Sequence, residues 1–193
     1  MKKDIRQTDW YVPLMPRERQ TSAQPVELTE HDASDVADLY ARCSDYFLLQ
    51  DGEPPTLADA RELFSDVPPE KEVRDQTVFG WRGTDGLYAI AAILQDYPVN
   101  GTWYLGFMIV DPARRGRGVG RVIYSVLEDW AASHGAGEIR LAVLAHNKAG
   151  ERFWRSLGFE EVRRVGPDTF KTRSHHRVEL TRSLNGNSAN DPV

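Results

Sequence analysis

Apolar residues recur along this chain with two different spacings, which predict the order of its strands and helices. Residues 77–81, 87–95 and 103–110 are short apolar runs rich in aromatic and β-branched side chains, a pattern typical of buried strands. Other apolar residues fall at helical spacing and predict the buried faces of two helices. The first face consists of Val36, Leu39, Tyr40, Cys43 and Phe47, and the second of Val119, Val122, Ile123, Val126, Leu127 and Trp130.

Turn and cap signals set the limits of further elements. A short strand is expected around residues 26–28, followed by a helix start at Thr29-Glu-His-Asp32, which resembles a capping box. The sequence 50–55 predicts a loop, and Thr56 to Asp59 predicts the start of a helix that runs through Val67 and ends at two prolines. Residues 82–86 predict a hairpin turn between two strands.

The second half of the chain continues the alternation. Ile139, Leu141 and Val143 alternate with polar residues and predict a strand, and Asn147 starts a short helix that ends at Leu157. One or two strands follow, through about residue 162 and over 170–180. Strands and helices in this order predict one α/β domain.

Length and composition fit that domain. The chain has 193 residues, 40% hydrophobic and 27% charged, which is ordinary for a soluble globular protein. We expect an N-terminal extension over residues 1–24, the domain over 25–184, and a disordered polar tail over 185–193. There are no internal repeats.

Charge and cysteine content restrict partners and location. The net charge of −5 and the isoelectric point near 5.6 argue against a general nucleic-acid partner. The single cysteine, Cys43, allows no internal disulfide and fits a reducing compartment. The apolar run Tyr88 to Leu94 is too short to span a bilayer, and the first seven residues lack the apolar core of a secretion signal. We therefore expect a cytoplasmic protein without a membrane partner.

The most informative segment lies between the strand at 103–110 and the helix that begins at Val119. It reads Asp111-Pro-Ala-Arg-Arg-Gly-Arg-Gly-Val-Gly120. A glycine loop between a strand and a helix N-terminus directs backbone N–H groups at a phosphate. Its G-x-G-x-G spacing matches neither the dinucleotide fingerprint nor the P-loop. The simpler interpretation is a solvated basic loop.

Two motifs in sequence order give this segment a closer interpretation. Arg115-Gly-Arg-Gly118-Val-Gly120 fits the pattern Arg/Gln-x-x-Gly-x-Gly/Ala, and Asn147 is followed by a helical aromatic residue and then by Gly158-Phe159. In both respects the chain resembles the Gcn5-related N-acetyltransferase (GNAT) family, from about Leu87 to Phe159. The resemblance implies a mixed, mainly antiparallel twisted sheet flanked by helices, the acyl-CoA N-acyltransferase fold.

The resemblance also implies a cofactor and its contacts. In the family the glycine loop holds the pyrophosphate of coenzyme A, and backbone N–H groups of the preceding strand contact the pantetheine and the thioester. Here the strand positions are Met108, Ile109 and Val110, whose side chains we expect to pack in the core. The other expected contacts to acetyl-CoA are Arg115, Gly116, Arg117, Gly118, Val119, Gly120, Arg121, Asn147 and Trp154.

One departure from the family concerns proton transfer. The family's usual tyrosine, which protonates the departing sulfur, is Trp154 here, and an indole N–H is no acid near neutral pH. In some relatives a strand glutamate is the base, and that position is Tyr104. Tyr104 is therefore the candidate proton-handling residue; the alternatives are a packed aromatic beside Trp103 and solvent as the proton partner. Cys43 lies on a predicted buried face, so we expect direct transfer in a ternary complex rather than an acyl-cysteine route.

The acceptor site is expected between the first two helices and neighbouring strand residues. These segments hold the acidic and aromatic residues Asp45, Tyr46, Asp51, Glu53, Asp96 and Tyr97. Together they suit a cationic amine, although loop acids are also common on solvated surfaces. Of His175 and His176, at most one faces inward, and no ligand set at metal spacing surrounds them, so no metal site is predicted.

The sequence thus predicts an acetyl-CoA-dependent N-acetyltransferase that acts on a primary amine of a small molecule or protein. The alternative is a non-catalytic CoA-binding regulatory module of the same fold, which Trp154 keeps open. An RNA-binding role for the arginine-glycine loop conflicts with the acidic net charge. The sequence identifies neither the acceptor amine nor the choice between a monomer and a homodimer.

Overall fold

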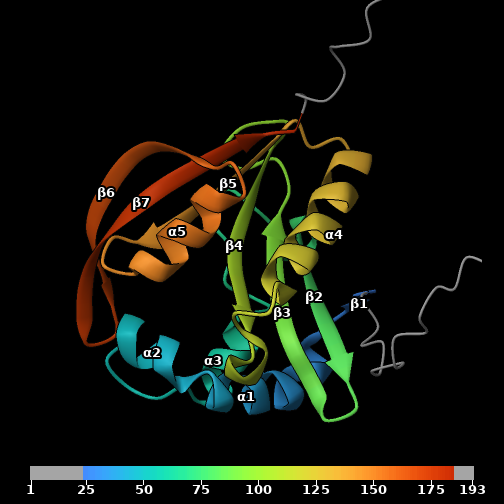
Figure 1. Cartoon of the computed structure of the whole chain (residues 1–193), viewed down its shortest axis with the longest axis vertical. Coiled ribbons are helices and arrows are strands. Elements are labelled where there is room, and N and C mark those ends of the chain that lie inside the picture. Colours follow the sequence, from blue (N-terminus) through green and yellow to red (C-terminus); the bar gives the residue numbers. More distant parts are fainter. Residues whose placement is uncertain (1–23, 185–193) are drawn as a thin grey trace, which may run out of the picture.

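The computed structural model describes residues 24–184, which form one seven-stranded sheet with helices on both faces (Figure 1). The predicted tail 185–193 and the predicted extension 1–24, except its last residue, lie outside the described residues. The strands are β1 (Val26–Glu27), β2 (Gln76–Gly83), β3 (Gly86–Leu94), β4 (Thr102–Val110), β5 (Glu138–Leu144), β6 (Glu160–Phe170) and β7 (Arg173–Ser183).

The sheet has the order β1-β2-β3-β4-β5-β7-β6. All neighbouring strands pair antiparallel except β4 and β5, which are parallel. A parallel pair needs a crossover, and the glycine loop and a long helix provide it. The predicted mixed, mainly antiparallel α/β fold is confirmed.

Five α-helices cover the two faces of the sheet in the described part of the chain. They are α1 (Ala33–Arg42), α2 (Ser44–Gln50), α3 (Leu57–Glu62), α4 (Val119–Ser133) and α5 (Lys148–Ser156). One buried cluster contains α4 and α5 side chains such as Ile123 and Trp154. A separate cluster contains α1 and α2 side chains such as Leu39 and Phe47. In Figure 1, α1 to α3 lie together at one end of the sheet, and α4 runs beside β2 to β4.

The predicted first helix is divided. All five residues of its predicted buried face are buried, but the helix breaks at Cys43 into α1 and α2. The N–H of Cys43 donates to the carbonyl groups of both Leu39 and Tyr40, which tightens the last turn and ends α1. The break lets α2 change direction toward the β6–β7 hairpin (Figure 1).

The predicted second helix is shorter than expected. It starts at the predicted capping box of Thr56 and Asp59 but ends at Glu62 instead of Val67. The N–H groups of Phe64 and Ser65 bond three residues back, so the chain forms tight turns after the helix. Pro68 and Pro69 donate no N–H and disfavour helical geometry before them, which explains the early end.

Strand β4 carries a bulge that opens the sheet. In its pairing with β3, Ala92 lies opposite Phe107 and Ile93 opposite Leu105, so Gly106 is the extra residue. Pairing with β5 covers only Thr102–Tyr104. Beyond Tyr104 the two parallel strands separate, and their edges border a gap next to the glycine loop (Figure 1).

No helix of the described residues is both long and apolar enough to cross a membrane.

Candidate active site

A cleft of about 810 Å³ opens where β4 and β5 separate, and we call it the first cleft. Its lining comes from β4, the glycine loop, α2, β5, α5 and the β6–β7 hairpin. Most of the predicted cofactor residues line it, namely Met108, Ile109, Val110, Arg115, Gly116, Gly118, Gly120, Arg121, Asn147 and Trp154. Arg117 and Val119, also predicted, do not line it.

The glycine loop presents its backbone to this cleft. Gly116 and Gly118 have φ of +73° and +80°, and Gly118 is the N-cap of α4. A Cβ at either glycine would meet nothing within 4 Å, so the backbone faces open space. Within residues 24–184, no backbone hydrogen bond is recorded from the N–H groups of residues 116–118, and the N–H groups of Val119 and Gly120 belong to the first turn of α4, where a helix provides no internal partner. Free N–H groups at the N-terminus of a 15-residue helix form a site for an anion.

Gly120 has a different reason to be glycine. A Cβ there would lie 3.1 Å from the ring of Phe153 on α5. The third glycine therefore allows α4 and α5 to approach each other at the loop. It does not provide a left-handed backbone.

The arginine side chains of the loop are placed unequally. The Nε of Arg115 donates to the Val110 carbonyl at 2.8 Å, and its terminal nitrogens pair with Asp45 on α2. Arg121 reaches Ser156, while Arg117 is exposed with no partner recorded between residues 24 and 184. Arg115 thus fastens the loop to α2 and to the end of β4, and Arg117 is free to meet an anion.

The backbone of β4 alternates between its two neighbours. The N–H of Asp111 donates to the Tyr88 carbonyl in β3, so by strand alternation the N–H of Ile109 also faces β3. The N–H groups of Met108 and Val110 then face the gap toward β5. Two of the three predicted backbone N–H groups therefore face the first cleft. The side chains of Ile109 and Val110 are buried as expected, whereas that of Met108 is only half-buried and packs against the core.

Asn147 and Trp154 are both used in packing α5. The Oδ1 of Asn147 accepts the Gly150 N–H at 2.9 Å and caps the helix, so this oxygen is not free for a ligand. Trp154 is 9% exposed and contacts Tyr124 and Phe159 edge to face, at 5.7 and 5.4 Å between ring centres. Trp154 reaches the first cleft as a largely buried aromatic wall.

A second cleft of about 730 Å³ lies on the side of the sheet covered by α1 to α3. Of the predicted acceptor residues, Tyr46, Asp51 and Tyr97 line it. Glu53 instead pairs with Lys171 at 3.4 Å, and Asp96 accepts the Gly101 N–H at 2.7 Å inside a turn, so neither lines the cleft. Asp45, which pairs with Arg115, lines the first cleft.

The two clefts share part of their walls. Residues that line both are Tyr46, Gln50, Tyr104, Gly106, Phe107, Phe170 and Arg177. A ligand from each side can therefore meet the other at the bulge of β4. A reaction between two separately bound substrates would require a shared wall of this kind.

Tyr104 is the predicted proton-handling residue, and it belongs to the shared wall. Its ring packs edge-on against Tyr97, with 5.6 Å between ring centres. Burial, opposed by the nearby charge of Arg177, raises the pKa of Tyr104 to about 12. The hydroxyl is therefore protonated across the neutral range, as a proton donor must be.

Cys43 and the histidines lie where the sequence predicts. Cys43 is fully buried, and burial raises the pKa of its thiol to about 11, so it is no thiolate at neutral pH. His175 is buried and its Nε2 donates to the Gln50 carbonyl, while His176 is exposed. Over residues 24–184, no three histidine, cysteine or acidic side chains cluster as a metal site.

The sequence matches the model of the acetyltransferase (GNAT) family over residues 33–159. The chain belongs to this family. The match includes the glycine loop, the split between β4 and β5, and α5, which together form the first cleft. The resemblance stated from the two motifs is confirmed.

Relatives by sequence cover parts of this GNAT chain. YobR, an uncharacterised N-acetyltransferase of Bacillus subtilis, is 25% identical over 118 residues, which are 61% of this chain and 44% of YobR. An uncharacterised protein of Mycobacterium leprae, ML0378, is 47% identical over 53 residues, 28% of this chain and 14% of that protein. The chain thus matches less than half the length of these curated relatives.

Solved GNAT structures share the fold. An acetyltransferase from Thermus thermophilus superposes with a TM-score of 0.64 at 22% identity, covering 83% of this chain and 96% of that one. The ribosomal-protein-S18-alanine N-acetyltransferase of Escherichia coli gives 0.61 at 18% identity, covering 87% and 99%. At these identities the likeness concerns the fold.

Some residues of the shared wall were not predicted. These are Gln50, Gly106, Phe107, Phe170 and Arg177. Gly106, a lone glycine inside an apolar strand, carried a usable signal, because such a glycine often marks a bulge. The other four come from segments distant in sequence and had no motif to identify them.

Proposed function

We propose that this protein is an acetyl-CoA-dependent N-acetyltransferase that acts on a primary amine. The observation that carries the proposal is the shared wall, where a cleft with an anion-binding loop meets a second cleft on the other side of the sheet. An acyl donor that carries phosphate groups and a separately bound acceptor amine could then meet at Tyr104. Binding the two at one point removes much of the entropic barrier to their reaction.

The residues of the first cleft fit acetyl-CoA. The free N–H groups of residues 116–120 and the positive end of α4 would hold the pyrophosphate, with Arg117 adding charge. The N–H groups of Met108 and Val110 would bind the pantetheine and the thioester oxygen. When bound, acetyl-CoA supplies an acetyl thioester, whose carbonyl carbon the amine nitrogen attacks, forming N–C and breaking C–S.

The chain contributes orientation and a proton. Tyr104 would give its hydroxyl proton to the sulfur as the C–S electron pair moves onto it, and water would accept the proton that the amine nitrogen loses. Tyr104 is then reprotonated from solvent. A backbone N–H directed at the thioester oxygen stabilises the negative charge that develops there.

Direct transfer is favoured over an acyl-enzyme. The buried thiol of Cys43 contacts the Val110 carbonyl at 3.7 Å and lines neither cleft. Its pKa is raised, so the thiol is not activated as a nucleophile. The acetyl group would therefore pass to the amine in one step within a ternary complex.

The charges of the second cleft favour a cationic acceptor. Each of its cationic side chains is paired with a carboxylate, as in Lys171 with Asp59 at 2.6 Å and Arg163 with Glu179 at 2.6 Å. Over residues 24–184, Glu62 and Asp66 line the cleft without forming an ion pair. Their uncompensated charge would attract an ammonium group.

The test is a screen of primary amines, namely polyamines, arylalkylamines, aminoglycosides and peptides, with thiol detection of released CoA and mass detection of the acetylated product. Calorimetry with CoA runs alongside. We expect CoA to bind and at least one amine class to gain 42 mass units as thiol appears, since acetyl replaces hydrogen. CoA binding without transfer to any class would reject the enzyme proposal.

One observation favours a second candidate, a CoA-binding regulatory module without turnover. Trp154 occupies the place of the family's acidic tyrosine and is mostly buried. If the Tyr104 hydroxyl does not protonate the leaving sulfur, the site has no tyrosine in that role. The same screen separates the two, since a module would bind CoA and transfer nothing.

A further inference from the structure

A chain of hydrogen bonds runs along the end of α2 into the wall shared by the two clefts. The hydroxyl of Tyr46 lies 2.7 Å from Oε1 of Gln50, and Nε2 of Gln50 lies 3.2 Å from Oδ1 of Asp51. Tyr46 and Gln50 line both clefts, and Asp51 lines the second. Asp51 is only 6% exposed, so its carboxylate is one of the few buried charges here.

The buried carboxylate fixes the direction of every bond in this chain. The Nε2 of Gln50 donates to Oδ1 of Asp51, because a carboxylate oxygen accepts hydrogen bonds and the amide nitrogen can only donate them. The amide oxygen then faces Tyr46 and must accept the hydroxyl proton. The Tyr46 hydroxyl has one proton, which is used in the hydrogen bond to Gln50, so only the lone pairs of its oxygen can bind a ligand.

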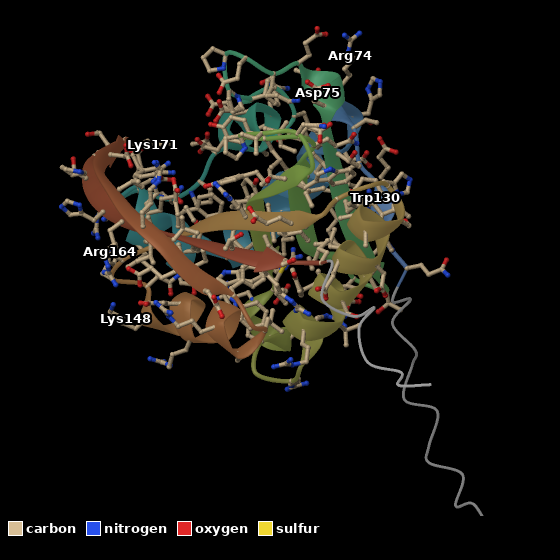
Figure 2. All side chains as sticks on the ribbon, turned by 90° about the horizontal axis from the view of Figure 1, so that it is seen from above. Arg74, Asp75, Trp130, Lys148, Arg164 and Lys171 are labelled. Atoms are coloured by element: carbon tan, nitrogen blue, oxygen red, sulfur yellow. The ribbon has the colours of Figure 1, made fainter. Side chains whose placement is uncertain are left out.

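The peptide backbone of the same residues is held from the other side. His175 on β7 contacts the Gln50 carbonyl at 2.8 Å, and the Thr172 hydroxyl and N–H donate to the Asp51 carbonyl at 2.6 and 3.2 Å. Lys171, which Figure 2 labels on the β6–β7 hairpin, pairs with Asp59 on α3. These contacts fix the end of α2 before any ligand binds.

We propose that Tyr46 binds the acceptor amine, its oxygen accepting an N–H of the amine, and that Gln50 and Asp51 are positioning residues that set this polarity. The proposal rests on the proposed transferase function and specifies the group that recognises its acceptor. It also gives the two tyrosines opposite roles. Tyr46 presents a hydrogen-bond acceptor to the amine, whereas Tyr104 keeps a proton to donate.

The polarity has a chemical consequence for selection. Groups that only accept hydrogen bonds, such as carboxylates and ether oxygens, find no donor at Tyr46, while an ammonium or amine finds an acceptor. Burial, with Asp51 adding to it, raises the pKa of Tyr46 to about 12, so the hydroxyl keeps its proton at neutral pH. Tyr46 therefore orients the amine but does not deprotonate it.

The test measures amine binding to the protein saturated with CoA, which cannot react. Calorimetry uses 2-phenylethylamine, spermidine and alanine amide as probes against wild type, Tyr46→Phe, Asp51→Asn and the double variant. Tyr46→Phe should weaken the best probe about tenfold, the value of a hydrogen bond from a charged donor, with CoA affinity unchanged. In Asp51→Asn, the new amide can both donate and accept hydrogen bonds, so the amide of Gln50 is no longer held in one orientation. The Tyr46 hydroxyl can then also turn its proton toward the amine, and binding should weaken several-fold.

The double variant is decisive, because Asp51 is proposed to act only through Tyr46. Adding Asp51→Asn to Tyr46→Phe should cause no further loss. A further loss would mean that Asp51 attracts the amine directly or supports the fold, and the positioning role would be wrong. Tyr124→Phe and Asp129→Asn, which lie on α4 and line neither cleft, are the matched controls and should bind as wild type.

The outcomes separate this proposal from the transferase proposal. If the probes bind and depend on Tyr46 but no acetyl transfer occurs, the amine site stands and the transferase proposal fails. If transfer occurs and Tyr46→Phe leaves amine binding and KM unchanged, the transferase stands and this proposal fails. It also fails if none of the three probes binds the wild-type complex.

Discussion

The proposed ligand contacts of the first cleft come mainly from one continuous stretch, residues 108–120, and are mainly backbone N–H groups. The second cleft takes its groups from α2, α3, β4 and the β6–β7 hairpin, and uses side chains. A backbone site depends on glycines and a helix start, which tolerate little change. A side-chain site can alter its ligand by single substitutions without moving the sheet.

The difference suggests a division of labour between the two sides. The backbone site suits a ligand common to the whole family, and the side-chain site suits an acceptor particular to each protein. Changes in the first cleft should therefore affect cofactor binding for every acceptor. Changes in the second should affect acceptor binding and leave CoA affinity intact.

The largest effect is expected from Gly118→Val. A β-branched side chain at φ +80° strains the N-cap of α4 and occupies the open space at the free N–H groups. Losing two charge-assisted hydrogen bonds should weaken CoA binding about 100-fold or more. The matched control is Gly135→Val, which places the same residue at φ +99° beyond the other end of α4, also in open space.

Both variants should lose a similar stability, on the order of 1–2 kcal/mol, but only Gly118→Val should lose CoA affinity. Calorimetry and thermal unfolding measure the two quantities. Equal CoA affinity in the two variants would remove the loop from the site. Gly120→Val is a poorer probe, because its side chain would strike Phe153 and shift α5.

The next effect concerns Tyr104, where the two clefts meet. Tyr104→Phe keeps the ring and should lower kcat at least about tenfold without changing CoA affinity, since general acid help is worth ~10²–10⁴-fold. Because burial raises the pKa of this hydroxyl to about 12, the wild-type rate should not fall from loss of the acid until the pH approaches that value.

Steady-state rates across the alkaline range check this prediction. Tyr97→Phe, which removes the hydroxyl of the neighbouring ring, serves as the comparison, and Trp154→Tyr in the Tyr104→Phe background should recover part of the rate. A Tyr104→Phe rate equal to wild type at every pH would leave Tyr104 as packing and solvent as the proton donor.

A smaller effect is expected for Arg117, the exposed cation of the loop. Arg117→Ala should weaken CoA binding about fivefold at low salt, and the difference should shrink in 0.5 M salt, where charges are screened within a few ångström. Arg164→Ala, on the outer strand β6 (Figure 2), provides the control for a change in net charge. A loss that does not depend on salt would assign Arg117 a structural role.

The smallest effect on activity is expected for Cys43→Ala. The side chain is fully buried, so its loss should destabilise the protein by about 1–3 kcal/mol while turnover is largely kept. Denaturant unfolding and the CoA-release assay measure both. An inactive variant that folds and binds CoA, or an acetylated Cys43 detected by mass spectrometry, would contradict direct transfer.

The same division explains what the sequence could predict. The glycine loop, β4 and α5 are local patterns, and their limits agree with the structure to within one residue. Tyr46, Asp51 and Tyr97 were predicted only because they are acidic or aromatic residues in segments expected to border the acceptor site. Glu53 and Asp96 met the same criterion, but they lie outside the second cleft. Only tertiary folding decides which loop acids are buried.

The break at Cys43 and the shared wall show the same limit. Helical spacing continues across Cys43, so the pattern contains no sign that α2 turns toward the β6–β7 hairpin. Gln50 then joins Tyr46 and Asp51 because Thr172 and His175 hold its end of the helix. Such contacts, more than 100 positions apart, leave no trace in local periodicity.

The central claim is that the backbone of residues 108–120 binds coenzyme A. Amide NMR of the ¹⁵N-labelled protein during CoA titration tests it most directly, because each N–H reports its own hydrogen bond. The account predicts the largest shifts at Gly116, Gly118 and Gly120, with further shifts at Met108 and Val110 and little change at Ile109. Unchanged glycine amides at CoA saturation, with shifts confined to other segments, would contradict it.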